Sequence, residues 1–424
     1  MERQLTAFCA DRSLVELLEL SKCSNDVLDL LQPRENQHSD LLAWCLNARE
    51  GHGQGDAILK DFLIAIYGAT TVDTAGDKLQ GNGLTRDFVR DWTPSRIMTT
   101  SFATAVCYRE HEIPYATNSS KVRLDLLLID SDNKLIVIIE NKAGAKFRKG
   151  QLAGYLASVQ ASLLSREAFK QIVVAFVAMD RNLDTELAED APPANFDKRW
   201  ALLNYEWLRP GGERAQLAVN RGNQNASLLM SYCQRQTGWE STESRKITNL
   251  AAELVTQYPI VVSEIRRVVT QKLRPDEWVP KLLSQEGVDG QLLKLYPQNE
   301  NAINRLLNLT PLQLLRGKII DAFPDIESDI DAFELGRVWA NYRVPIGHEL
   351  PMVDGRWPLY VYVRYLKPGS GKRSEFRIRL VWRPFCVPDD QRETVCNSLA
   401  AAFVKARNTA DRLNAKHLVE GPPA

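Results

Sequence analysis

The chain has 424 residues, 44% hydrophobic and 25% charged, a balance that is typical of globular proteins and excludes low-complexity chains. Lysine plus arginine and aspartate plus glutamate each number 53, so the net charge is zero and excludes a global electrostatic attraction to nucleic acid. Seven cysteines with no C-x-x-C pair exclude a zinc ribbon, argue against a disulfide framework and indicate a reducing compartment.

The first part of the chain predicts helices. Residues 1–20 are interrupted by charges and lack the apolar core of a signal peptide. No apolar run approaches the roughly 18 residues of a membrane span, so we expect a cytoplasmic protein. Helices are expected at 12–32, at 35–47 and from Ile58 to Tyr67, where apolar residues recur at helical spacing. Residues 68–97 are rich in Gly, Thr and Asp, and we expect them to be irregular.

A strand-rich block follows. Strands are expected at 101–113, 122–129, 135–142 and 171–179, with a short last strand at 200–205 and a helix at 150–165. The run 171–179 is apolar almost throughout, as expected for a strand buried on both faces. This order of elements predicts an α/β fold in which helices flank a mixed-sheet core.

The character of the chain changes after about residue 240. We therefore expect two domains, 1–240 with the N-terminal helices and the sheet, and 245–424 as a C-terminal α+β region. The second region is expected to contain a long helix at 245–273, short helices to about 323, two paired strands and a final helix. Its role could be recognition, sensing or assembly, and the sequence does not decide among these.

The strand 135–142 (LIVIIENK) ends in three polar residues, and Glu140 and Lys142 share one of its faces. Residues 130–133 (DSDN) are a turn signal before it. A four-residue loop at 131–134 would place residue 125 opposite residue 140. The hairpin therefore predicts that Asp125 and Glu140 are neighbours on one face.

Two adjacent carboxylates repel unless one is protonated or a cation lies between them. Oxygen ligands of this kind suit Mg²⁺ or Mn²⁺. Lys142 on the same face could orient or deprotonate an attacking water and stabilise the charge of a phosphorane. From the hairpin alone, a surface ladder of ion pairs that includes Arg123 is an equally good interpretation.

Taken in order, these residues resemble the PD-(D/E)XK nuclease superfamily. The pattern is Asp125, then Glu140-Asn141-Lys142, then a helix that begins with Gln151 and carries Tyr155. Leu124 stands where the proline of the name would be. The Q-x-x-x-Y helix is similar to the RecB-like branch. The segments 35–44 and 51–56 resemble an uncharacterised bacterial branch whose members often look defence-associated.

The resemblance covers roughly residues 30–205 and implies a restriction-endonuclease-like fold and a nuclease that uses Mg²⁺ or Mn²⁺ to hydrolyse DNA. It implies that Asp125 and Glu140 bind the metal, that Glu35 completes the metal site and that Lys142 acts on the water or the transition state. The residues that would support the site are Gln151, Tyr155 and His38. The residues that would contact phosphates are Lys146, Arg148 and Lys149.

Several alternatives stay open. Glu35 could instead complement a helix dipole, and His38 could be a packed structural residue. Glu110 and Glu112 are rival acids whose simpler interpretation is that of solvated strand carboxylates. The function could be that of a non-catalytic nuclease-like module that binds nucleic acid or a partner, or that of an RNase. A homodimer and a partner protein bound through the C-terminal region are also open.

Overall fold

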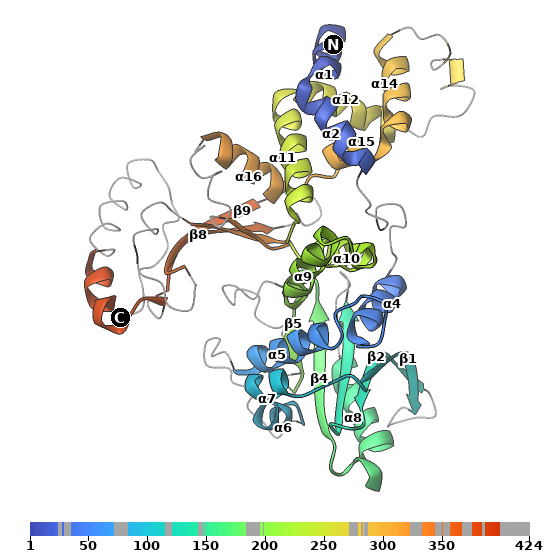
Figure 1. Ribbon diagram of the computed structural model, residues 1–424, viewed down its shortest axis with the longest axis vertical. Coiled ribbons are helices and arrows are strands. Elements are labelled where there is room, and N and C mark those ends of the chain that lie inside the picture. The colour runs from blue at the N-terminus through green and yellow to red at the C-terminus, as the bar shows by residue number, and fades with distance from the viewer. Residues whose placement is uncertain are drawn as a thin grey trace. The chain divides into compact units, whose positions relative to one another are not determined.

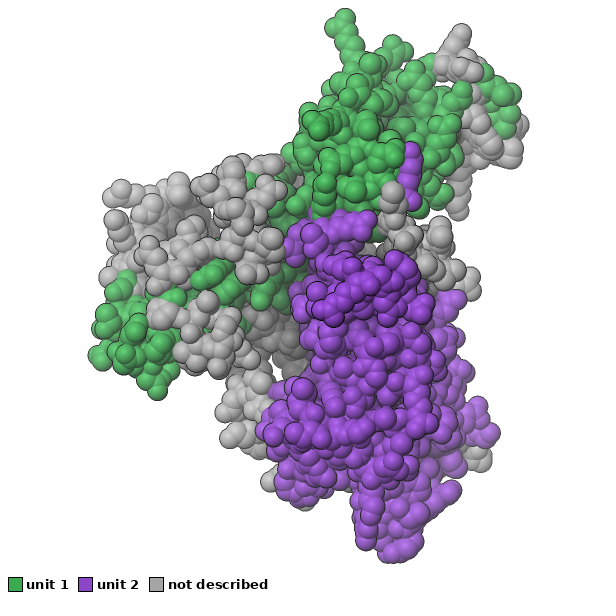
Figure 2. All heavy atoms as spheres, viewed as in Figure 1, with its two compact units in different colours: residues 1–21, 246–424 green, residues 22–245 purple. Residues whose placement is uncertain are grey.

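The chain divides into two compact units, which Figure 2 distinguishes by colour. Unit 2 comprises Lys22–Arg245, and unit 1 combines Met1–Ser21 with Lys246–Ala424. The structure is a computed structural model, and it describes residues 1–23, 28, 35–71, 84–114, 121–142, 147–148, 150–183, 196–197, 199–270, 279–280, 283, 287–322, 333–343, 350, 357–366, 375–383 and 386–398.

Unit 2 is built on a five-stranded mixed sheet (Figure 1). In spatial order the strands are β1 (Val106–Pro114), β2 (Lys121–Asp130), β3 (Leu135–Lys142), β4 (Val173–Asp180) and β5 (Ala201–Leu203). The first three are antiparallel, and β3, β4 and β5 run parallel to one another. This topology confirms the predicted α/β fold with a mixed-sheet core.

Helices cover both faces of this sheet. One face packs against α4 (Glu35–Leu46), α5 (Ala57–Thr71), α6 (Leu84–Asp91), α7 (Pro94–Thr99), α9 (Arg209–Asn220) and α10 (Ser227–Gln236). The other face packs against α8 (Gln151–Val159) and the π-helix Gln160–Leu164 that follows it. Val137 and Ile139 face the first group, and Ile136 and Ile138 face α8. Burial on both faces explains why β3 is apolar until it reaches Glu140.

Two short helices occupy a segment that the sequence analysis expected to be irregular. Residues 84–91 form α6, and α7 begins at Pro94 with the side chain of Thr93 as its N-terminal cap. Phe88 of α6 is fully buried in the core of unit 2. The polar composition of 68–97 does not reveal these helices, because they are held by a few buried apolar residues, Phe88, Trp92 and Ile97, and by the Thr93 cap.

Unit 1 contains helices and a second sheet. Its helices are α1 (Glu2–Ala10), α2 (Arg12–Cys23), α11 (Thr242–Gln257), α12 (Pro259–Thr270), α14 (Gly287–Gln298), α15 (Glu300–Leu307) and α16 (Pro311–Ala322). The antiparallel sheet has the order β6 (Phe333–Leu335), β7 (Trp339–Arg343), β8 (Leu359–Leu366) and β9 (Glu375–Trp382). Among the described residues, no helix is both long enough and apolar enough to cross a bilayer.

The N-terminal helices lie in unit 1, whereas the sequence analysis grouped them with the first domain. Phe8 of α1 is buried in the same core as residues of α11 and α12, and its ring meets that of Tyr258 edge to face. Asp11 accepts a hydrogen bond from the Tyr258 hydroxyl at 2.7 Å, and Glu16 pairs with Lys246 at 2.6 Å. The amphipathic pattern predicts helices here, but it does not identify the surface against which they pack.

One predicted helix is two in the structure. The segment 245–273 was expected to be continuous, but α11 ends at Gln257 and α12 begins at Pro259. Proline has no N–H to donate, and its ring disfavours the helical conformation of the residue before it. The break therefore follows from Pro259, which the periodicity of the apolar residues does not reveal.

Two glycines on helices of unit 2 provide a matched test of this packing. A Cβ at Gly212 of α9 would lie 2.8 Å from the Trp239 ring and 2.9 Å from the Cβ of Cys233, whereas a Cβ at Gly68 of α5 meets nothing within 4 Å. We predict that Gly212→Ala lowers the free energy of unfolding by about 1–3 kcal/mol. Gly68→Ala should leave it unchanged or raise it by up to about 1 kcal/mol. Urea unfolding followed by tryptophan fluorescence measures both, and equal effects of the two substitutions would contradict the packing.

Candidate active site

Asp125 and Glu140 are brought together by the β2–β3 hairpin. Asp130 pairs with Leu135, and the register continues to Leu126 opposite Ile139. This is the predicted register. One residue further along, the Oδ2 atom of Asp125 accepts a hydrogen bond from the backbone N–H of Asn141 at 2.8 Å. The two acids therefore stand at the position where the strands stop pairing.

The backbone of β2 rotates at Asp125. Leu126 packs on the α4–α5 face of the sheet, whereas Leu124 packs on the α8 face, although regular alternation would give them the same face. On the other side, β1 pairs at the residues before and after Glu110 but not at Glu110 itself, whose φ is 51°. The backbone of Asp125 is thus not paired with either neighbouring strand. Its side chain, in place of a backbone carbonyl, accepts the hydrogen bond from the N–H of Asn141.

Glu140 is a buried acid with two donors on one oxygen. Its side chain is 1% exposed, and its Oε1 atom lies 2.5 Å from the Nζ atom of Lys142 and 2.6 Å from the Nε2 atom of Gln151. Burial, and then the charge of Asp125, raise the pKa of Glu140 to about 7, although Lys142 acts in the opposite direction. Burial alone would lower the pKa of Lys142, but the hydrogen bond and charge of Glu140 raise it overall.

The helix α8 adds a second layer to the site. Gln151 is its first residue, and its Nε2 atom also lies 3.2 Å from the hydroxyl of Tyr155, one turn later. Burial and the charge of Glu140 raise the pKa of Tyr155 and keep its hydroxyl protonated. Gln151 therefore contacts Glu140 directly, and Tyr155 contacts Gln151 on the same face of the sheet.

The other oxygen of Glu140 indicates what the two acids could hold. Its Oε2 atom is buried and has no hydrogen-bond partner among the described residues. A buried carboxylate oxygen without a partner is costly, and a neighbouring carboxylate adds repulsion. A divalent cation between Glu140 and Asp125 would remove both costs. Carboxylate oxygens are the ligands that Mg²⁺ and Mn²⁺ prefer, so these residues fit such an ion.

The described residues supply two acids rather than a complete cluster. Among them, no group of three or more His, Cys, Asp or Glu is placed to bind a metal ion. The side chain of Glu35, the expected third acid, lies outside the described residues, although its backbone begins α4. Mg²⁺ commonly binds through one or two carboxylates together with waters and substrate phosphate, so two acids are compatible with it.

Other predicted residues are distributed differently. The Nδ1 atom of His38 is 2.9 Å from the Nε2 atom of Gln236, and its backbone carbonyl accepts a bond from Tyr232, which favours the structural interpretation. Arg148 is exposed, and its N–H donates to the side chain of Gln151 at 3.2 Å. Lys146 and Lys149 lie outside the described residues.

The rival acids are engaged by surface cations. Glu112 pairs with Lys121 at 2.8 Å, and Glu110 lies 3.5 Å from Arg123. Both acids are substantially exposed. These contacts are those of solvated strand carboxylates, which is the interpretation that the sequence analysis preferred.

Sequence reasoning missed the contacts on the opposite face of β3. The Nδ2 atom of Asn141 donates to the hydroxyl of Ser39 on α4 at 2.9 Å, and its Oδ1 atom accepts a hydrogen bond from Tyr205. All three side chains are buried. Alternation along the strand could have placed Asn141 on this face, but no local pattern marks Ser39 or Tyr205 as its partners. These three side chains connect β3, the motif strand that carries Glu140, Asn141 and Lys142, to α4, the helix that begins at Glu35.

Comparison with known proteins supports the family. The family model of the PD-(D/E)XK nuclease superfamily matches residues 25–234, which covers nearly the whole of unit 2 and just under half of the chain. No curated protein and no solved structure matched the chain at a significant level. The match confirms the resemblance drawn from Asp125, Glu140 and Lys142, while the RecB-like branch stays a prediction.

The raised pKa of Glu140 predicts a pH dependence of stability in the absence of metal. Because the folded state favours the protonated acid, its stabilising contribution is complete below about pH 4.5 and is lost as the pH rises through about 7. The stability of the wild type relative to Glu140→Gln should therefore fall by up to about 3 kcal/mol between pH 5 and 8. Thermal unfolding in EDTA across this range measures the difference.

Glu112→Gln is the matched control, because Glu112 is exposed and lies on the same sheet. The stability of the wild type relative to Glu112→Gln should not fall between pH 5 and 8, since Lys121 lowers the pKa of Glu112 and the wild-type contribution is then complete above about pH 4.5. If the difference in the free energy of unfolding between the wild type and Glu140→Gln stays constant from pH 5 to 8, the raised pKa of Glu140 is refuted.

Proposed function

Since residues 25–234 belong to the PD-(D/E)XK nuclease superfamily, we propose that this chain is a metal-dependent nuclease that hydrolyses phosphodiester bonds in DNA. One observation carries the proposal. The buried Glu140 leaves an oxygen without a partner beside Asp125, and Lys142 lies within 2.5 Å of its other oxygen. An acid pair that can bind a metal ion, with a cation beside it, supplies groups that support hydrolysis of a phosphodiester.

The proposed cofactor is Mg²⁺ or Mn²⁺, held by Asp125 and Glu140, with Glu35 as the third acid. When bound, the ion supplies charge neutralisation and a more acidic water. Asp125 would keep its hydrogen bond to the N–H of Asn141, which orients one of its oxygens and leaves the other for the ion. Gln151 would hold Glu140 in place through its Oε1 atom.

Lys142 is proposed to bind the phosphate and stabilise the charge that develops on it. The neighbouring acids raise its pKa, so it is a cation in this arrangement. A donor that is already aimed at the acid pair needs little reorganisation to meet a phosphate held by the same ion. Tyr155 and Gln151 would position the lysine and the acid rather than contact the reacting atoms.

DNA is the proposed substrate, and RNA is the alternative, because an acid pair with a lysine does not distinguish the 2′-hydroxyl. Arg148, with Lys146 and Lys149, is proposed to contact backbone phosphates beside α8. A role in prokaryotic defence against foreign DNA is proposed from the resemblance of segments 35–44 and 51–56 to a bacterial branch. Loss of protection from phage in cells that carry Lys142→Ala in place of the wild type would support this role.

A second candidate function is that of a non-catalytic module with the same fold. The ion pair between Lys142 and Glu140 favours it, because an internal cation can satisfy a buried acid without any metal. This alternative predicts binding of nucleic acid or of a partner protein with no metal-dependent hydrolysis. The Oε2 atom of Glu140 argues against it, since the ion pair leaves this oxygen without a partner.

We predict that the purified chain cuts DNA with Mg²⁺ or Mn²⁺ and not in EDTA. Lys142→Ala and Asp125→Asn should each reduce the rate by about 100-fold or more, because each removes charge stabilisation at the phosphate. A gel assay with supercoiled, linear and single-stranded DNA and with RNA measures the rate and identifies the substrate class.

Lys170→Ala is the matched control, because Lys170 is an exposed lysine just before β4, at the end of the β3–β4 ladder opposite Lys142, and it pairs with Glu167. It should cut at the rate of the wild type. Cutting that survives in both Lys142→Ala and Asp125→Asn would refute the assigned site. Tight binding to DNA with no cutting in any metal would favour the non-catalytic module.

A further inference from the structure

We infer that Arg181 is a binding residue for a backbone phosphate of the nucleic acid, on the side of the motif strand opposite Glu140 and Lys142. Arg181 directly follows β4, and its N–H donates to the carbonyl of Lys142 at 3.2 Å. It therefore stands at the carboxyl ends of two parallel strands, which is where ligands bind in sheets of this kind. The inference rests on the proposed function, since it names a further contact to the same substrate.

The surroundings of the Arg181 guanidinium are polar but carry no ion pair. Its Nη1 atom is 3.5 Å from the Oε1 atom of Gln236, at the limit of a hydrogen bond, and its Nε atom is buried with no partner in the ranges that the structure describes. Within the described part of the chain, Arg181 makes no salt bridge, whereas most other half-buried arginines of unit 2, such as Arg209 and Arg214, do. A half-buried guanidinium with an unused N–H is costly unless an anion completes it.

The hydroxyl of Tyr205 lies near both Arg181 and Asp125, one member of the acid pair of Asp125 and Glu140. Burial raises the pKa of Tyr205, the charge of Arg181 lowers it and that of Asp125 raises it. Tyr205 is thus within electrostatic reach of both charges, while it donates its hydrogen to Asn141. The backbone of Arg181 and the side chain of Asp125 are also hydrogen-bonded to consecutive residues of β3, Lys142 and Asn141, which places both near the same end of that strand.

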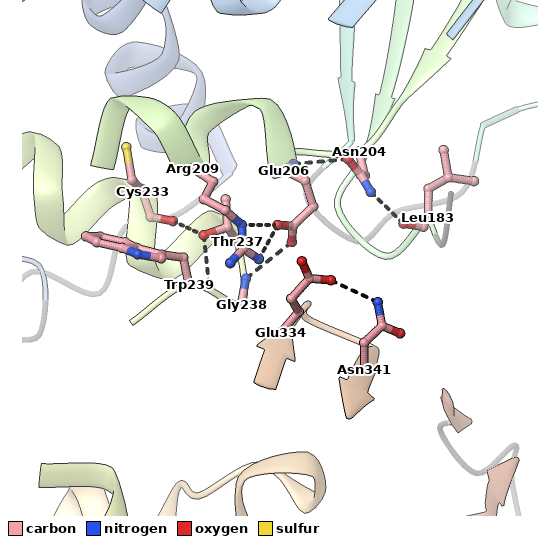
Figure 3. A network of polar contacts seen from close by, with 10 residues as sticks. All are labelled: Leu183, Asn204, Glu206, Arg209, Cys233, Thr237, Gly238, Trp239, Glu334 and Asn341. Carbon is pink, nitrogen blue, oxygen red and sulfur yellow. Dashed lines mark hydrogen bonds and ion pairs between the residues drawn. The ribbon is translucent and has the colours of Figure 1, made fainter. Parts of the chain in front are cut away.

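A polar network holds the elements that surround Arg181 (Figure 3). Asn204 donates to the carbonyl of Leu183 at 3.3 Å, which ties the segment after Arg181 to the residue before Tyr205. Glu206 pairs with Arg209 at 2.7 Å and accepts from the N–H of Gly238 at 3.3 Å. These bonds fix the chain on both sides of Tyr205 and just after Gln236. The backbone around the guanidinium is therefore held in place, which limits the conformational entropy lost when Arg181 binds a ligand.

The chemistry of the ligand follows from the residue. A planar guanidinium with free N–H groups matches the paired oxygens of a phosphate. The groups near the guanidinium are neutral: they are the amide of Gln236 and the hydroxyls of Tyr205 and Tyr232. Among the described residues, the one acid that acts on the charge of Arg181 is Asp180, the residue before it in the chain. A nucleic-acid backbone that places its scissile phosphate at Lys142 offers further phosphates at the spacing of its nucleotides, and Arg181 would bind one of these.

The test is the salt dependence of DNA binding by the full chain. A short fluorescein-labelled duplex is titrated in EDTA, so that metal-dependent cutting does not occur, and anisotropy is recorded at several salt concentrations. Arg181→Gln should weaken binding about tenfold and reduce the slope of log K against log salt by about 0.9, the value for one lost phosphate contact. Arg221→Gln is the matched control, because Arg221 is an exposed arginine of unit 2, and its slope should equal that of the wild type.

Arg181→Lys keeps the charge and guards against a folding defect in the glutamine variant. It should retain the slope but bind several-fold more weakly, because a lysine cannot make the paired contact. Slopes and affinities equal to the wild type in both Arg181 variants would overturn the inference. The inference and the proposed function can fail separately, because the salt slope reports binding whether or not the chain cuts DNA, whereas the effect of Asp125→Asn on cutting does not depend on Arg181.

Discussion

The buried carboxylate of Glu140 is the constraint on which the rest of this site depends. An acid that is 1% exposed must be neutral, paired or bound to a cation, and here the neighbouring Asp125 makes the charge still less favourable. Lys142 and Gln151 satisfy one of its oxygens, and the other has no partner. The sheet brings the carboxylates of Asp125 and Glu140 together where the pairing of β2 with β3 ends and the backbone of β2 rotates. A buried acid with a raised pKa beside a second carboxylate is typical of functional sites.

The motif strand divides its polar end between two tasks. Glu140 and Lys142 point toward α8, where Gln151 meets them. Asn141 points to the other face and bonds Ser39 of α4 and Tyr205, so the strand that carries the charges is anchored by its neutral residue. The period of two in a β-strand makes this division possible, because consecutive residues serve opposite faces. A single substitution at Asn141 would therefore disturb the position of α4 as well as that of the strand.

The sequence predicts most of the sheet and the centre of the site, because those depend on local rules. Turn chemistry and alternation are enough for the hairpin register that joins Asp125 to Glu140. Contacts between distant segments were not predictable in this way: Tyr205 and Ser39 meet Asn141 only because the helices pack on the sheet. The same limit applies to the N-terminal helices, whose amphipathic faces are evident but whose partners in unit 1 are not. Pro259 is a local signal that outweighs periodicity, because a proline ends the helix that precedes it.

We propose that Asp125 and Glu140 together hold a divalent cation. Anomalous diffraction from crystals of the full chain grown with Mn²⁺ would locate the ion. We expect an anomalous peak bonded to the carboxylates of both residues, with the Oε2 atom of Glu140 among the ligands. Absence of a peak at this position at saturating Mn²⁺, with the Lys142 contact to Glu140 intact, would refute the proposed metal site and leave Glu140 as the partner of an internal ion pair.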